Sequence, residues 1–149
     1  MIVRSLNIRG GGNYSKRRRI ICIINSGKAY IFLIQESKLK EVDRKVIGNL
    51  WNNQEVIWYF NKSHGQFKGI ITMWNENSIQ CVFTFSGEGF LGVKVVWKNE
   101  FYYVINVYSG CSINSKRKLW VELCLCKRKW LNGKWIIGGD FNAVSNSYE

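Results

Sequence analysis

Short apolar runs alternate with polar punctuation along the whole 149-residue chain, and their periodicity separates strands from helices. Runs with alternating or continuous apolar positions, bounded by Gly, Asn or Ser, are typical of β-strands. The segment 29–36 is apolar almost throughout, as expected for a strand buried on both faces. The pattern predicts strands over 1–8, 29–36, 55–60, 69–74, 79–85, 90–97, 101–108 and 134–140.

Other segments carry their apolar residues at helical spacing, and we expect helices over 15–27, 40–53 and 115–130. Ser15 is placed to cap the start of the first helix, and Gly27 to end it. The expected apolar faces consist of Ile20, Ile23 and Ile24 in the first helix, of Val42, Val46, Leu50 and Trp51 in the second, and of Leu119, Leu123, Cys126 and Trp130 in the third.

The order of these elements predicts one α/β domain over residues 1–149. Two strand–helix pairs are followed by a meander of strands, and a helix and a strand close the chain. Such an order favours α and β layers around a sheet or a sandwich. A chain of this length can bury about 70% of its unfolded surface, so it can form a real core.

The charge is strongly basic, with 22 Lys and Arg against 10 Asp and Glu and a formal net charge of +12. This excess favours a polyanionic partner, with nucleic acid first and an anionic membrane surface second. Basic clusters at 16–19 and 116–118 lie at the start of predicted helices, where positive charge is unfavourable because it opposes the helix dipole. Basic residues at an unfavourable position suggest that they bind a partner. The alternative is an ordinary solvated basic surface.

The cysteines indicate a reduced, intracellular protein. There are five, an odd number, and no C-x-x-C spacing occurs that would suggest zinc. Cys22, Cys124 and Cys126 lie in apolar stretches and are expected in the core, together with Trp120 and Trp135. No secretory signal and no stretch long enough to span a bilayer is visible. We therefore expect an intracellular location, the nucleus included, without secretion or a membrane partner.

Polar residues end three of the predicted strands and are candidates for chemistry: Asn7 after the first, Gln35 and Glu36 after the second, and Asp140 and Asn142 after the last. Carboxylates and amides from different strands could share a hard cation such as Mg²⁺. Asp and Asn at strand ends also begin turns or cap helices, and this alternative stays open.

Four motifs, SLNIRG, FLIQESK, NVYSG and IIGGDFNAV, follow one another from the first residues to the last. In this order they resemble the endonuclease/exonuclease/phosphatase superfamily, the DNase I-like fold, and most of all the endonuclease domains of plant non-LTR retrotransposons. Arg9 stands where repair-type members tend to carry an acidic or amide residue, as in the retroelement branch. The resemblance implies a four-layer α/β sandwich, and we expect 134–140 to lie beside 1–8 and 29–36.

The resemblance also implies Mg²⁺- or Mn²⁺-assisted cleavage of DNA, with no small-molecule cofactor. Glu36 would bind the metal and Asn7 would belong to the metal site, while Asp140 would orient or deprotonate the attacking water. Tyr108 and Asn142 would contact the scissile phosphate. The expected nucleic-acid contacts are Arg9, Lys38, Arg17, Arg18, Lys116 and Arg117.

The sequence also departs from the family pattern. The family's fold continues beyond GDFN to a terminal Ser-Asp-His that is not found in this sequence, and the single His64 lies in a predicted surface loop. Gly110 and Lys134 replace prolines that are common in the family. We therefore expect the N-terminal part of an endonuclease domain that is inactive as it stands, with exposed apolar strand surface. A non-catalytic nucleic-acid-binding remnant is the alternative, and a phosphatase of the same superfamily is less favoured. The sequence does not indicate the oligomeric state.

Overall fold

The computed structural model describes residues 1–10, 14–52, 55–61 and 69–143. The chain forms strands and helices close to the expected segments. In order they are β1 (Val3–Asn7), α1 (Tyr14–Asn25), β2 (Ile31–Gln35), α2 (Arg44–Leu50), β3 (Val56–Asn61), β4 (Ile70–Asn75), β5 (Gln80–Gly87), β6 (Phe90–Trp97), β7 (Glu100–Tyr108), α3 (Ile113–Lys129) and β8 (Lys134–Asp140).

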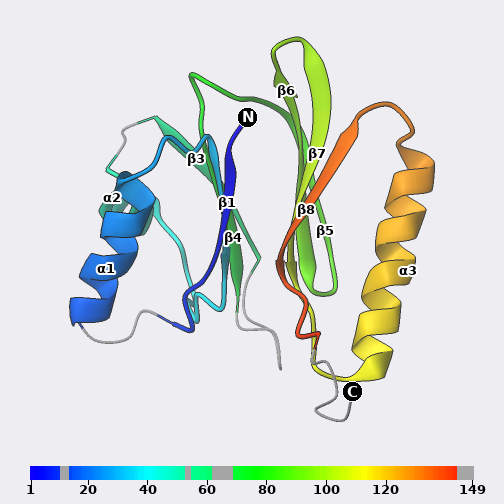
Figure 1. The fold of residues 1–149 in the computed structure, drawn as a ribbon, viewed down its shortest axis with the longest axis horizontal. Coiled ribbons are helices and arrows are strands. Elements are labelled where there is room, and N and C mark those ends of the chain that lie inside the picture. Colours follow the sequence, from blue (N-terminus) through cyan, green and yellow to red (C-terminus); the bar gives the residue numbers. More distant parts are fainter. Residues whose placement is uncertain (11–13, 53–54, 62–68, 144–149) are drawn as a thin grey trace.

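The strands form two four-stranded mixed sheets, which pack face to face (Figure 1). The first has the order β1-β2-β4-β3 and the second the order β5-β6-β7-β8. Among the strand pairs of the described residues, β1 with β2 and β7 with β8 are the parallel ones, and each of these pairs is joined through a helix, α1 or α3. A parallel pair needs such a crossover, so the two strand–helix–strand units explain why helices occur at these places.

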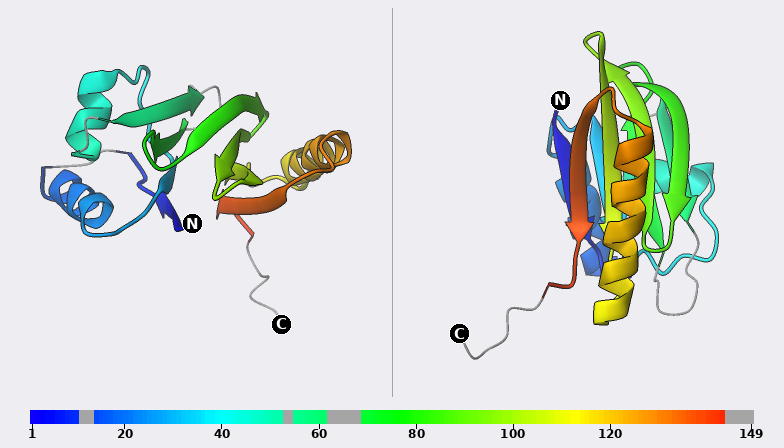
Figure 2. Two further views of the ribbon diagram at one scale, coloured as in Figure 1. Left: turned by 90° about the horizontal axis from the view of Figure 1, so that it is seen from above. Right: turned by 90° about the vertical axis from the view of Figure 1, so that its right-hand side faces the viewer.

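The apolar residues sort into three clusters that define four layers (Figure 2). One cluster fills the space between α1, α2 and the first sheet. A second lies between the sheets, where Leu33 and Trp74 of the first meet Leu91 and Val93 of the second. The third packs α3 onto the second sheet through Leu119 and other residues. The expected four-layer α/β sandwich is confirmed.

The strand β8 occupies a different place from the one expected from the motifs. It pairs with β7 in the second sheet and faces β1 and β2 across the sandwich instead of lying beside them. A Cβ atom on Gly138 would lie 3.0 Å from Leu33 Cδ1, and one on Gly139, at φ 142°, would lie 2.0 Å from the carbonyl oxygen of Val107. The two glycines therefore permit close packing within the protein, between the sheets and along β7.

Helix ends and helix faces differ in detail from the sequence-based expectation. Helix α1 begins before Ser15, which is therefore not its cap. Helix α2 is capped by Asp43, and α3 is capped by Ser112, whose Oγ accepts a hydrogen bond from the backbone of Ser115. Residues that were expected in the core but are exposed are Cys22, Ile23, Trp120 and Cys124. Each helix covers its sheet with a narrow stripe: Ile20 and Ile24 in α1, Ile47 in α2, and Leu119 and Leu123 in α3.

Candidate active site

Side chains from both sheets converge where β1, β2, β7 and β8 end. The amide nitrogen of Asn7 lies 2.6 Å from Asp140 Oδ2 and 3.3 Å from Glu36 Oε1. The hydroxyl of Tyr108 donates to the same Glu36 oxygen at 3.2 Å. Four residues that lie far apart in the sequence thus form one hydrogen-bonded cluster, with two carboxylates linked through one amide.

Asn142 completes this arrangement through the turn that follows β8. Its backbone N–H donates to Asp140 Oδ1 at 2.9 Å, and its side-chain amide donates to the carbonyl of Ser109 at 2.6 Å. The N–H of Ser109 in turn donates to the backbone carbonyl of Asp140 at 2.9 Å. The ends of β7 and β8 are therefore tied together, and both Asp140 carboxylate oxygens have partners.

A buried polar network lies directly behind the cluster and joins the two sheets. Asn106 of β7 is fully buried; its Oδ1 accepts a hydrogen bond from Gln35 Nε2 at 2.7 Å, and its Nδ2 donates to the Ile71 carbonyl at 2.9 Å. Gln35 also exchanges hydrogen bonds with Ser5. Sequence reasoning singled out Gln35 but gave no role to Asn106, although Asn106 is the first residue of the NVYSG motif.

The backbone around the cluster is held in an uncommon conformation. Among the described residues, six non-glycine residues have positive φ, and Arg9, Glu36, Lys38 and Asn142 are four of them. The remaining two, Lys98 and Asn99, form the tight turn between β6 and β7. Side chains at positive φ cost free energy and tend to gather at functional sites. Nothing in the residue types predicted this strain, since Arg, Glu and Lys seldom adopt it.

The donor chemistry of the cluster fits a hard divalent cation. Glu36 is 8% exposed, so its carboxylate is held in a largely buried setting. In the described part of the chain, no group of three or more His, Cys, Asp and Glu residues could hold a metal ion. Mg²⁺ commonly takes one or two carboxylates and completes its shell with water and substrate phosphate. The pair Glu36 and Asp140 supplies such a set.

Asn7 is placed to orient the carboxylates. Its amide nitrogen faces Glu36 and Asp140, whereas its amide oxygen accepts a hydrogen bond from the backbone N–H of Arg9 at 3.0 Å. That N–H requires the oxygen as its acceptor, which settles the orientation of the amide. In this orientation the amide nitrogen of Asn7 fixes the direction of the two carboxylates.

The predicted nucleic-acid-binding residues lie around the same end of the sandwich, where α1 and α3 begin and β8 ends (Figure 1). Arg9 and Lys38 are exposed on the loops that follow Asn7 and Glu36. Arg18 lies over the ring of Tyr14, with 5.8 Å between its guanidinium carbon and the ring centroid. Lys116 and Arg117 lie in the first turns of α3. These cations come from several elements that begin or end at this end of the sandwich.

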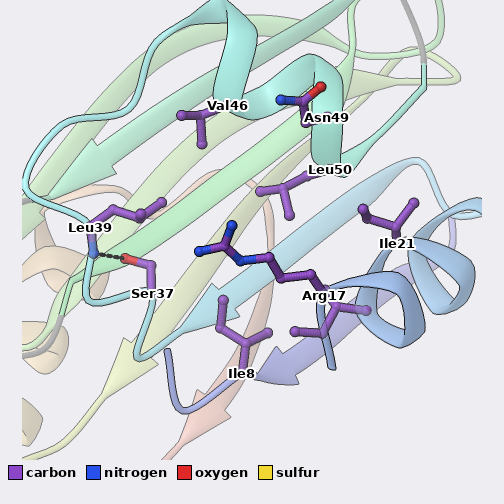
Figure 3. Close-up of a pocket in the computed structure, with 9 residues that line it drawn as sticks. Ile8, Arg17, Ile21, Ser37, Leu39, Val46, Asn49 and Leu50 are labelled. Carbon is purple, nitrogen blue, oxygen red and sulfur yellow. Dashed lines mark hydrogen bonds between the residues drawn. The ribbon is translucent and has the colours of Figure 1, made fainter. Parts of the chain in front are cut away.

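Arg17 differs from these residues because it extends over a pocket between α1 and α2 (Figure 3). The pocket has a volume of about 280 Å³ and is lined largely by aliphatic side chains, among them Ile8, Leu39 and Leu50. Ser37 and Asn49 add the few other polar groups of the lining. Arg17 is therefore one of the few polar side chains of this pocket. His64, predicted to lie in a surface loop, falls outside the described residues.

One charged pair far from the candidate site has shifted pKa values. Glu100 and Lys134 form an ion pair at the opposite end of β7 and β8, with 2.7 Å between Lys134 Nζ and Glu100 Oε2. The hydrogen bond from Lys134 lowers the pKa of the Glu100 carboxyl and raises the pKa of Lys134 itself. Burial raises the pKa of the Cys81 and Cys126 thiols, which disfavours their thiolate forms.

Comparison with known proteins identifies one matching family. The family described as "Endonuclease/Exonuclease/phosphatase family" matches residues 5–149. No curated protein matches the chain. No helix in the described part of the chain is long and apolar enough to cross a membrane.

Several solved structures share the fold. The endonuclease domain of TRAS1, a telomere-specific non-LTR retrotransposon, matches with a TM-score of 0.66 and 17% identity over 95% of this chain and 60% of that chain. D. rerio TDP2 complexed with a single-strand DNA product matches with a TM-score of 0.65 and 13% identity, over 96% and 60% of the two chains. A family protein from Leptotrichia buccalis matches with a TM-score of 0.68 and 10% identity, over 95% and 66%. The chain therefore spans about 60% of the length of the first two of these structures.

Proposed function

Because the chain belongs to the endonuclease/exonuclease/phosphatase family and has its DNase I-like fold, we propose that it is a divalent-metal-dependent DNA endonuclease domain of a retroelement-derived protein. The observation that carries the proposal is the convergence of Asn7, Glu36, Tyr108 and Asp140 in one hydrogen-bonded cluster. The reaction is hydrolysis of a phosphodiester bond, in which water bonds to phosphorus and the leaving oxygen departs.

Each residue of the cluster has a role that follows from its position. Asp140 orients the attacking water and accepts its proton, as a carboxylate held by two hydrogen bonds can do. Tyr108 donates its hydroxyl hydrogen to Glu36 and lies near the bound phosphate, and Asn142 helps to hold that phosphate. Asn7 fixes the carboxylates so that little reorganisation is needed. A divalent ion held by Glu36 would supply charge neutralisation at the phosphate.

DNA is the proposed partner for two reasons: the net charge of the chain, and a structure of similar fold that contains a DNA product. The net charge of +12 favours a polyanion, and D. rerio TDP2 is described with a single-strand DNA product. Arg9 and Lys38 each follow a residue of the cluster by two positions and are exposed, which supports their proposed role as phosphate contacts. A DNA substrate also makes a nuclear location the natural one.

Metal binding can be tested without any turnover. Titration of the purified chain with Mn²⁺ should broaden the NMR signals of residues around Glu36 and Asp140 first. Glu36→Gln should abolish this local broadening, whereas Glu100→Gln, which removes a carboxylate from the opposite end, should leave it unchanged. Broadening that begins elsewhere, or that survives Glu36→Gln, would show that the cluster is not the metal site.

We expect the 149-residue chain to cleave DNA very weakly or not at all. The cluster supplies metal binding, phosphate contact and water positioning, but the described residues contain no imidazole that could stabilise the transition-state charge. Loss of one such preorganised donor costs about 10²–10³-fold in rate. Efficient nicking of supercoiled plasmid with Mg²⁺, abolished by Asp140→Ala, would contradict this expectation.

The second candidate function is binding of nucleic acid without catalysis. The observation in its favour is the same strongly basic composition, with a net charge of +12. Plasmid nicking with Mg²⁺ separates it from the first candidate, since a pure binder would retain DNA without cutting it. A phosphate-release assay on phosphomonoesters tests the less favoured phosphatase activity.

A further inference from the structure

The outward face of α3 carries a regular stripe of exposed side chains. Leu119 and Leu123, 2% and 3% exposed, point into the layer between α3 and the second sheet. Arg117, Val121, Cys124 and Arg128 follow one another at spacings of four and three residues and lie on the opposite side of the helix. All members of this stripe are exposed.

Trp120 connects this stripe with the candidate active site. Its ring is stacked on Phe141 with 5.7 Å between centroids and 4° between planes. Phe141 stands between Asp140 and Asn142 in the chain, so the indole is held next to the turn that positions the cluster. Trp120 is nevertheless 46% exposed, which is unusual for so large an apolar ring.

A shallow groove runs along the helix beside the indole. It has a volume of about 300 Å³ and is lined by Trp120, Val121, Cys124, Leu125 and Arg128. The aromatic ring and the aliphatic side chains give it an apolar floor, and Arg128 places a cation at one end. Such a volume is at the lower end of the range for small-ligand clefts.

The charges around the groove favour a polyanion as its occupant. In the described part of the chain, Lys118 pairs with Glu88 at 3.6 Å, but Lys116, Arg117 and Arg128 form no ion pair. Arg117 and Arg128 lie about three helical turns apart on the same face, roughly 16 Å along the axis. A polyanion that also presents flat aromatic groups fits both the cations and the exposed indole. Single-stranded nucleic acid has both features.

We propose that this face of α3 binds a single nucleic-acid strand, with an unpaired base stacked on Trp120 and with Arg117 and Arg128 contacting its phosphates. The proposal rests on the proposed function and deepens it, because it names the substrate class. The preferred substrate carries unpaired bases next to the scissile phosphodiester. A fully paired duplex buries the faces of its bases and cannot make this contact.

The test compares two strands that differ only in their bases. Fluorescence anisotropy, with EDTA present and at fixed salt, is measured with an oligothymidylate of about 12 nucleotides, within the range of single-strand site sizes. The second strand has the same length but abasic tetrahydrofuran units throughout. The wild-type chain should bind the strand with bases more tightly, and this comparison needs no variant. Equal affinity for the two strands overturns the proposal.

Variants locate the contact. Trp120→Ala should weaken binding of the base-containing strand about 5- to 150-fold, the range expected for one stacked base, and leave abasic-strand binding nearly unchanged. Trp120→Phe should retain most of the affinity. Phe101→Ala removes an aromatic residue that is 45% exposed at the start of β7, the end opposite the candidate site, and serves as the matched control. Unchanged binding by Trp120→Ala overturns the proposal.

Other outcomes separate this proposal from the proposed function. If the chain binds both strands equally and Mn²⁺ still binds at Glu36, only the stacking contact fails. If the chain binds neither strand at low salt, DNA fails as the partner and both proposals fall. If Trp120→Ala changes the sedimentation of the protein and not its DNA binding, the face is a protein contact, and the stacking proposal is wrong.

Discussion

Replacement of the buried Asn106 should weaken the junction between the two sheets. The side chain accepts one hydrogen bond from Gln35 and donates to the Ile71 carbonyl, at 2.7 and 2.9 Å, and it is fully buried. In Asn106→Ala, Gln35 Nε2 keeps its contacts to Ser5 Oγ and to the Leu33 carbonyl, both at 3.1 Å. The lost acceptor, the lost donor and the small cavity together should cost about 2–4 kcal/mol of unfolding free energy.

Urea unfolding followed by tryptophan fluorescence measures this loss directly. Asn114→Ala is the matched control, because it removes the same groups from an exposed position in the first turn of α3. The control should change stability by less than about 0.5 kcal/mol, as surface substitutions generally do. A loss of similar size in both variants would refute the idea that the buried network holds the sheets together.

The same variant should also disturb the candidate site. Gln35 precedes Glu36, and Asn106 lies two residues before Tyr108, so the network fixes the two residues that meet at the Glu36 carboxylate. Mn²⁺ affinity should therefore fall in Asn106→Ala under conditions where the protein is still folded, and should be unchanged in Asn114→Ala. If Asn106→Ala is folded and binds Mn²⁺ with normal affinity, the network stabilises the fold but does not position the candidate site.

Three further predictions concern other parts of the molecule. Gly139→Ala should cost several kcal/mol or prevent folding, since φ is 142° and its Cβ would lie 2.0 Å from the carbonyl oxygen of Val107. Gly48→Ala, in open space on α2, should instead stabilise the protein by about 0.5–1 kcal/mol, and thermal melting compares the two variants. The pKa of Glu100 is lowered in the folded protein, so the stability that Glu100 contributes is present at pH above its ordinary pKa of 4.5 and is lost as pH falls through the lower pKa of the folded state. Glu100→Gln should therefore lose less stability in acid than the wild type when urea midpoints are compared. Binding to duplex DNA should weaken steeply with salt: a plot of the logarithm of the binding constant against the logarithm of the salt concentration should have a slope of about −5 if all six predicted cations contact phosphates. Anisotropy titrations that show no salt dependence would exclude these phosphate contacts.

The layered fold could be predicted because each element carries its own periodic signal. The strands β5, β6 and β7 have either alternating apolar and polar residues or continuous apolar residues, and clear turns separate them. The strand–helix–strand order determines where the crossover helices lie. The partners of β8 could not be predicted, since its apolar pattern is equally compatible with either sheet. Register and pairing depend on contacts between distant residues such as Gly138 and Leu33, which no local pattern contains.

The candidate site was only partly visible in the sequence. Asn7, Glu36 and Asp140 could be selected as polar residues at strand ends and from the motifs, and the structure brings them together. Asn106 begins the NVYSG motif, but nothing in its residue type or spacing shows that its side chain joins the two sheets. The direction of the Asn7 amide also depends on tertiary structure, since it is set by the N–H of Arg9.

The division of the sandwich between the two halves of the chain has a consequence for folding. The first sheet is built only from residues before 76 and the second only from residues after 79, and the site takes Asn7 and Glu36 from one half and Tyr108 and Asp140 from the other. Each half can order its own strands through contacts that are close in sequence, so such ordering is compatible with fast early steps. The carboxylate cluster exists only after the halves dock. Metal affinity acquired during refolding therefore reports the docking step, separately from the formation of either sheet.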